Sequence, residues 1–146
     1  MKAKCLKSIN AILVFLMGLL GFSGCEWMRA KYGVPTGDLD IEGQVLNEKN
    51  QELPNIQIVA RQGWKDGGGT MYWQQYADTL YTDSTGRFNR FYEDIFPLEY
   101  HQIIANDTSG VYASDTIDAT VSYSGGNGGW YEGEATLNVT FILQKK

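Results

Sequence analysis

The most constraining feature of this 146-residue sequence is an alternation of apolar and polar residues with a period of two, which recurs from Asp38 to the C-terminus. Its clearest part is the apolar series Ala135, Leu137, Val139, Phe141 and Leu143. Successive side chains of a β-strand point to opposite faces of a sheet, so this series predicts a strand with one buried face. No stretch after Asp38 shows the 3.6-residue spacing of a long amphipathic helix. The alternation therefore predicts an all-β fold.

Turn signals divide this part of the chain into short segments. Strand patterns occur at residues 38–45, 56–61, 78–82, 99–107, 112–123 and 135–144, and a further one begins after Gly86. Asp83 and Gly86 stand first and fourth in the sequence Asp-Ser-Thr-Gly, as a type I hairpin turn prefers. Residues 63–70 contain three consecutive glycines and are expected to form a loop. About seven short strands predict a single seven-stranded, Greek-key-type β-sandwich over residues 38–146.

The N-terminus has the features of an export signal that ends at a cysteine. Three lysines precede an apolar stretch over residues 9–22, and no acidic residue occurs before Glu26. The stretch is shorter than the roughly 20 residues that a helix needs to cross a bilayer. A cleaved signal is therefore predicted rather than an anchor helix. Residues 1–24 are expected to be removed, which makes Cys25 the first residue of the mature chain.

Cys25 is predicted to carry the lipid of a lipoprotein. The sequence Phe-Ser-Gly-Cys at residues 22–25 resembles the lipobox of bacterial lipoproteins, in which the thiol is diacylated and the new amino terminus is acylated. The other cysteine, Cys5, lies in the segment to be removed, so no partner is left for an intramolecular disulfide. A catalytic cysteine would need a base nearby, and the only histidine, His101, lies in a strand-like run. Several acyl chains would hold the protein firmly on a membrane.

The mature chain is expected to be acidic and to lie in the cell envelope. Removal of residues 1–24 leaves nine basic and 17 acidic residues. Nucleic acid is therefore excluded as a partner, because phosphate binding depends on clustered lysine and arginine. Residues 25–37 contain few branched apolar residues and are predicted to form a short tether. The expected location is the outer membrane.

Three segments resemble the carboxypeptidase regulatory-like, transthyretin-like β-sandwich. They are IEGQV (41–45), LPNIQIVA (53–60) and YTDSTGRF (81–88). Members of this family often read G-x-V, L-P-x-V-x-V and T-D-x-x-G-x-F at the corresponding places. The resemblance implies a transthyretin-like sandwich, and these turn motifs carry no catalytic residues.

The whole chain is also similar to a family of small lipoproteins named for genes that neighbour radical SAM enzymes. The similarity extends from the lipobox through Tyr32-Gly33-Val34-Pro35 to the closing FILQKK. Members of this family place a Tyr-Gly-x-Pro element soon after the lipidated cysteine. The resemblance implies a radical SAM enzyme as a partner. It makes Tyr32, Gly33 and Pro35 candidate positions for modification if the chain is a substrate of that enzyme.

Residues that support catalysis or metal binding are scarce. A Ser-His-Asp site would have to use His101, which is expected to be a partly exposed strand residue, and the usual zinc ligands are missing. Asp107, Asp115 and Asp118 flank one predicted loop, and Ca²⁺ prefers oxygen ligands, but the D-x-D-x-D-G spacing is absent. No metal, cofactor or enzymatic activity is therefore predicted.

Aromatic residues gather around two glycine-rich stretches. Trp64 and Trp73 flank the first, and Trp130 and Tyr131 belong to the second, over residues 125–133, which is expected to be a flexible loop. Exposed aromatic rings can stack on sugar rings or anchor a protein contact, whereas the alternative is that they cover the edges of the sheets. These four residues are the candidate ligand contacts of a non-catalytic, lipid-anchored binding or structural module. A carbohydrate-binding surface lipoprotein is a further alternative.

Ser84 is a candidate position for glycosylation. The sequence Asp83-Ser84-Thr85 matches a pattern that some diderm bacteria O-glycosylate on exported proteins: Asp, then Ser or Thr, then an apolar residue or Thr. Residues 78–80 and 115–117 match it too. Because the turn at Ser84 is expected to be the most exposed of the three, Ser84 is the first choice.

Replacing Cys25 by Ala removes the thiol that the lipid would modify. We expect the variant to move from the membrane pellet to the soluble fraction, because stable attachment depends on the acyl chains. Cell fractionation with a high-salt wash measures this. A Cys25→Ala variant that stays in the washed pellet would contradict the lipid anchor.

Overall fold

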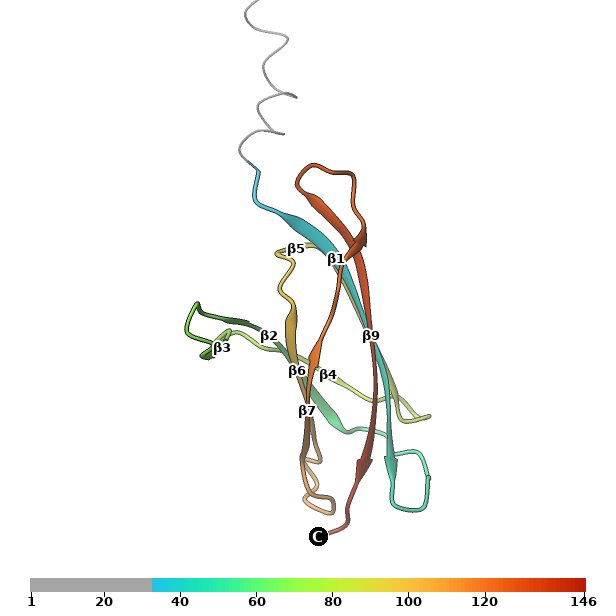
Figure 1. Ribbon diagram of the computed structural model, residues 1–146. Helices are drawn as coiled ribbons and strands as arrows, with labels where there is room; N and C mark the ends of the chain where they lie inside the picture. The colour runs from blue at the N-terminus through green and yellow to red at the C-terminus, as the bar shows by residue number, and fades with distance from the viewer. Residues whose placement is uncertain (1–32) are drawn as a thin grey trace, which may run out of the picture. The chain divides into compact units, whose positions relative to one another are not determined.

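The computed structural model describes residues 33–146, which fold into two packed β-sheets (Figure 1). In chain order the nine strands are β1 (Thr36–Asn47), β2 (Gln57–Lys65), β3 (Met71–Trp73), β4 (Asp78–Tyr81), β5 (Arg87–Ile95), β6 (Tyr100–Asn106), β7 (Asp115–Thr120), β8 (Ser124–Gly125) and β9 (Tyr131–Leu143). No helix occurs in this part of the chain. The predicted all-β, two-sheet sandwich is confirmed. The described residues contain nine strands rather than seven, because β3 and β8 are too short to show an alternation in sequence.

The first sheet, sheet A, has the strand order β5-β1-β9-β8. β1 is antiparallel to β5 and parallel to β9, with Leu39 opposite Ala135 and Val45 opposite Phe141. The registers of the two strands therefore agree, and their apolar residues share one face of the sheet. This pair joins the first strand of the domain to the last.

The second sheet, sheet B, has the strand order β3-β2-β6-β7, and β4 also pairs with β2. All of these pairs are antiparallel. β4 pairs with residues 57–60 of β2, and β3 pairs with residues 63–65. The two short strands thus follow one another along the same edge of β2.

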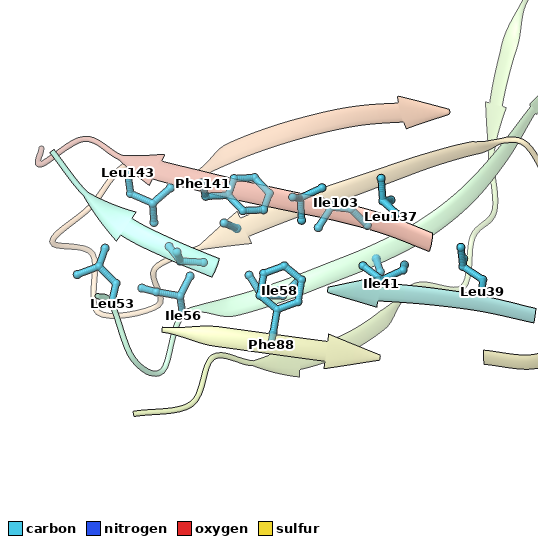
Figure 2. Packing of buried hydrophobic residues seen from close by; sticks show 14 of the residues in the cluster. Leu39, Ile41, Leu53, Ile56, Ile58, Phe88, Ile103, Leu137, Phe141 and Leu143 are labelled. Carbon is cyan, nitrogen blue, oxygen red and sulfur yellow. The ribbon is translucent and has the colours of Figure 1, made fainter. Parts of the chain in front are cut away.

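The core lies between the two sheets. The labelled side chains in Figure 2 point into the space between the strands, and they come from both sheets and from the connection before β2. Phe141, Ile58 and Ile103 are fully buried. Burial of such side chains stabilises the fold by about 1.5–3 kcal/mol each.

Gly43 and Phe88 form a close contact inside this core. The two residues are opposite one another on β1 and β5. A Cβ atom on Gly43 would lie 2.3 Å from the ring of Phe88 and 2.7 Å from the carbonyl oxygen of Val139. Only glycine therefore lets the Phe88 ring cover β1 at this point.

The predicted turn between β4 and β5 is present. The backbone N–H of Gly86 donates to the carbonyl of Asp83 at 3.0 Å, and Gly86 has a φ of +69°. The Asp83 carboxylate accepts hydrogen bonds from the backbone N–H groups of Thr85, at 2.8 Å, and Arg87, at 3.0 Å. Asp83 and Gly86 thus set the hairpin as their positions in the sequence indicate.

Thr82, just before this turn, holds the connection that leads into β2. Its buried hydroxyl donates to the carbonyl of Leu53 at 2.7 Å and accepts from the backbone N–H of Ile56 at 2.9 Å. This satisfies two backbone groups that would otherwise be buried without a partner. It also fixes the exposed Pro54-Asn55 corner against β4.

Two predicted loops are shorter than expected. The first was expected over residues 63–70, but residues 63–65 belong to β2 and pair with β3, so only residues 66–70 form the turn. The second was expected over residues 125–133, but residues 131–133 belong to β9. In both cases strand pairing extends the ladder into glycine-containing sequence, which the local glycine content alone does not predict.

Phe141→Ala should test this core. We expect the free energy of unfolding to fall by about 3–5 kcal/mol, because the change leaves a cavity where a fully buried ring was. Chemical denaturation measures the loss. The matched control is Ile142→Ala, since Ile142 is 48% exposed on the opposite face of the same strand. Equal losses for the two variants would mean that the register of β9 is wrong.

Candidate functional site

A pocket of about 310 Å³ opens where the two sheets meet at the β2–β3 end of the domain. Its apolar walls are formed by Leu39 and Ile41 of β1, Ala60 of β2 and Ile95 of β5. The alternation along β1 and β2 turns Leu39, Ile41 and Ala60 inward, where they also belong to the buried core. The polar part of the lining is Arg61, Gln62, Gln74, Tyr76, Asp78, Tyr92 and His101.

Asp78 anchors one side of the pocket through contacts with β5. Its carboxylate accepts hydrogen bonds from the Arg90 Nε, at 2.7 Å, and from the Tyr92 hydroxyl, at 3.1 Å. Partial burial, together with the Asp78 carboxylate, raises the pKa of Tyr92 to about 12. The charge of Asp78 is thus neutralised within the protein, and Tyr92 is held in its neutral form.

His101 lies at the back of the pocket. The side chain is 1% exposed, so the expectation of a partly exposed strand residue is wrong: β6 is a central strand, and residue 101 points toward sheet A. Its Nε2 lies 2.9 Å from the carbonyl oxygen of Leu98, and a carbonyl oxygen only accepts hydrogen bonds. Nε2 therefore carries the proton, which leaves Nδ1 as an acceptor. Burial lowers the pKa of His101 below its ordinary value, although the Leu98 carbonyl opposes this shift.

The β2–β3 hairpin places an aromatic pair beside the pocket. The rings of Trp64 and Tyr72 are stacked, with centroids 5.7 Å apart and an angle of 18° between their planes. Both residues are almost half exposed. Trp64, Gln62 and Ala60 alternate along β2 and share one face, so the pair continues the pocket wall outward. Tyr76, which lines the pocket, is 90% exposed.

Trp73 lies on the other face of the same hairpin. Its ring packs on Gly63, which is opposite it in the ladder. The Arg61 guanidinium lies 5.6 Å from the centre of the Trp73 ring and also donates to the Gln102 side chain. Gln102 in turn donates to Asp118 at 2.7 Å. Trp73 thus belongs to a polar ladder across the outer face of sheet B, not to the pocket.

Tyr131 is the first residue of β9 in sheet A, and Trp130 directly precedes it, away from the hairpin. The Tyr131 hydroxyl donates to the Asp38 carboxylate at 2.8 Å, and the backbone N–H of Thr36 donates to the Trp130 carbonyl. The four predicted ligand contacts are therefore split among three places. Only Trp64 lies beside the pocket.

The candidate calcium ligands take part in local hydrogen bonds. Asp107 accepts from the Ser109 hydroxyl at 2.6 Å and from the backbone N–H of Tyr112 at 2.8 Å, while Asp115 accepts from the backbone N–H that follows it. Within residues 33–146, no three His, Cys, Asp or Glu side chains come together in a way that could hold a metal ion.

A second, wider depression of about 600 Å³ lies beside Gly43 and Phe88. Short polar side chains of sheet A, such as Gln44, Asn89 and Thr140, line much of it. None of the predicted ligand contacts lies there, whereas Trp64 follows Gln62, a lining residue of the pocket at His101, on the same face of β2. We therefore take the pocket at His101 as the candidate site.

The predicted modification sites lie at the edge of the described chain or on its surface. Cys25 and Tyr32 lie outside the described residues, and Gly33 and Pro35 come just before β1. Lipidation and modification by a radical SAM enzyme stay predictions. Ser84 is exposed at the tip of the β4–β5 turn. Its glycosylation also stays a prediction. Among residues 33–146, no helix is long and apolar enough to cross a membrane.

No protein-family model and no curated protein sequence matches the chain. Several solved structures are similar to it in fold. The 3-chlorocatechol 1,2-dioxygenase from Rhodococcus opacus 1CP is 14% identical, with 75% of this chain and 60% of that chain covered and a TM-score of 0.47. The dioxygenase domain of a dioxygenase carbohydrate-binding protein fusion from Streptomyces sp. SirexAA-E is 14% identical, with coverages of 76% and 83% and a TM-score of 0.46.

The C-terminal domain of the shaft pilin SpaA from Lactobacillus rhamnosus GG is 7% identical, with coverages of 75% and 98% and a TM-score of 0.46. The chain spans 60% of the length of the Rhodococcus dioxygenase. These similarities concern the β-sandwich alone.

Tyr92→Phe should change the response of the protein to alkaline pH. Because the pKa of Tyr92 is raised from 10.0 to about 12 in the folded state, its contribution to stability is complete below pH 10 and is lost as the pH rises toward 12. We expect the free energy of unfolding of the wild type to fall more steeply over this range than that of the variant. Urea denaturation at several pH values measures both slopes. Identical slopes would show that Tyr92 is not protected from ionisation.

Proposed function

We propose that this protein is a non-catalytic binding module, anchored in the outer membrane by lipid at Cys25, and that the pocket at His101 is its ligand site. The observation that carries the proposal is a pocket of small-molecule size with apolar walls and a few converging polar groups. Binding sites for small molecules commonly have this composition, at volumes of roughly 300–1,000 Å³.

The state of the polar groups supports binding rather than catalysis. Asp78 is paired with Arg90 and Tyr92, so it is not a free base. Tyr92 keeps its proton until alkaline pH, and His101 is held by the Leu98 carbonyl. An enzyme would need a nucleophile or a tuned acid–base pair. The groups around this pocket instead offer fixed hydrogen-bond donors and acceptors.

The rigidity of the surrounding strands also supports this role. Ala60 lies between β6 and β4, whereas Gln62 pairs with β6 and its carbonyl accepts from the backbone N–H of Gln74 at 2.8 Å. Leu39 and Ile41 lie on β1, which is paired on both sides. The walls built on these paired strands are preorganised, which lowers the entropic cost of binding, while Gln74, Tyr76 and Ala77 come from the connection between β3 and β4.

Binding in the pocket can be tested with cyclohexanol, a neutral apolar ring that carries one hydroxyl group. We expect cyclohexanol to raise the Tm of the full mature lipoprotein in a non-ionic detergent, with a rise that grows with concentration, because a ligand of the native state stabilises it. The variant Ala77→Trp, which places an indole at the rim of the pocket, should abolish the shift.

The matched control is Thr79→Trp. Thr79 is exposed on β4 and does not line the pocket, so this variant should keep the wild-type response. The proposal is wrong if cyclohexanol leaves the Tm of the wild type unchanged. It is equally wrong if Ala77→Trp responds as the wild type does.

A further inference from the structure

We propose that the pocket and the Trp64–Tyr72 pair together bind a neutral glycan, with one sugar ring inside the pocket and the next ring on the aromatic pair. This inference rests on the proposed function, because it names the class of ligand that the same pocket takes. It follows from three features of the site: its lack of free charge, the acceptor at His101, and the exposed aromatic surface beside it.

The pocket offers no free charge to an ionic ligand. Its lining contains two charged residues, Arg61 and Asp78. The Arg61 guanidinium donates to Gln102 and lies over Trp73 on the outer face of sheet B. Asp78 is held by Arg90. An ion that entered the pocket would lose its hydration without gaining a counter-charge, so a neutral ligand is favoured.

His101 supplies a hydrogen-bond acceptor at the back of the pocket. Its Nε2 carries the proton that faces Leu98, and within residues 33–146 no group donates to Nδ1. His101 is among the residues that line the pocket, so Nδ1 is the acceptor that it would offer to a ligand there. A buried acceptor of this kind selects a ligand that brings a hydroxyl or N–H donor.

The polar rim matches a ring that carries several hydroxyl groups. The amide groups of Gln62 and Gln74 have the capacity both to donate and to accept hydrogen bonds, and Tyr76 adds an exposed hydroxyl. The opposite walls of the pocket are apolar and are formed by Leu39, Ile41, Ala60 and Ile95. A sugar ring has hydroxyl groups around its edge and C–H groups on its faces, so it satisfies both kinds of wall.

The aromatic pair extends the site by one further ring. Trp64 is two residues beyond Gln62 on the same face of β2, which corresponds to about 7 Å along the strand. Its stacking on Tyr72 holds the ring in place, while 46% of Trp64 stays exposed. An exposed, rigid aromatic face is suited to packing against the C–H face of a sugar. This spacing favours an oligosaccharide over a single sugar.

The test is calorimetric titration of the full mature lipoprotein in detergent with neutral hexasaccharides of cellulose, xylan, mannan and chitin, their monosaccharides, and an oligogalacturonate as a charged comparison. We expect at least one neutral hexasaccharide to bind and the oligogalacturonate not to bind. Trp64→Ala should weaken binding of that hexasaccharide by about tenfold, because it removes the stacking surface. The control Tyr81→Ala, an exposed aromatic on β4 outside this site, should bind as the wild type does.

The two parts of the site can be separated by the length of the ligand. Ala77→Trp should abolish binding of both the hexasaccharide and its monosaccharide, whereas Trp64→Ala should leave the monosaccharide unaffected. His101→Phe keeps a ring at the back of the pocket but removes the acceptor, and should weaken both ligands by about three- to tenfold. Trp64→Ala tests the inference on an exposed residue, so the outcome does not depend on whether the buried His101 variant folds.

Negative results in the cyclohexanol and glycan experiments separate the glycan inference from the proposed function. If cyclohexanol raises the Tm but none of the neutral hexasaccharides binds, the glycan inference is overturned and the pocket remains a binding site. If neither cyclohexanol nor any glycan binds, both proposals are overturned. Glycan binding that survives both Ala77→Trp and Trp64→Ala would place the glycan elsewhere and would also overturn the inference.

Discussion

The parallel pairing of β1 with β9 is the interaction on which the rest of this structure depends. It joins Thr36 to Tyr131 and continues to Asn47 and Leu143, so almost the whole domain lies between the two partners. Each strand alone exposes one apolar face, and the two faces are buried only when sheet B closes over them. A contact of such long range is slow to form, because the intervening chain must be ordered first. The Leu39 wall of the pocket exists only once this pair has formed.

The positions of the strands could largely be predicted from the sequence, but the pairing of the strands within the sheets could not. The alternation around Leu137 and Val45 marks strands because it reflects local geometry, and the turn from Asp83 to Gly86 has a local chemical signature. The parallel partner of β1 has no such signature, since alternation shows which face is buried and not which strand lies alongside. The role of Thr82 could not be predicted either, because its hydroxyl forms hydrogen bonds with a segment nearly 30 residues away in the sequence.

The candidate site was predicted only in part, for the same reason. Trp64 and Trp73 flank one glycine-rich turn in the sequence, and their aromatic character indicates a surface for ligands. Their faces are decided by the register of the hairpin, which sets Trp64 opposite Tyr72 and Trp73 opposite Gly63. A shift of β3 by one residue would bring Trp73 to the same face as Trp64. The polar groups of the pocket come from separate elements, and Tyr92 and His101 have no feature in sequence that links them.

β2 contributes residues both to the core and to the candidate site. Ile58 lies in the core, Gln62 lines the pocket and Trp64 forms the exposed aromatic surface, all on one face of the strand. The strand is paired on both sides over most of this length, so β2 leads from the core to the candidate binding surface without a flexible loop. The stability that β1 and β9 give to the sandwich thereby also positions the candidate site. The candidate site thus shares Leu39, Ile41 and Ala60 with the core, and Gln62 and Trp64 follow further along β2.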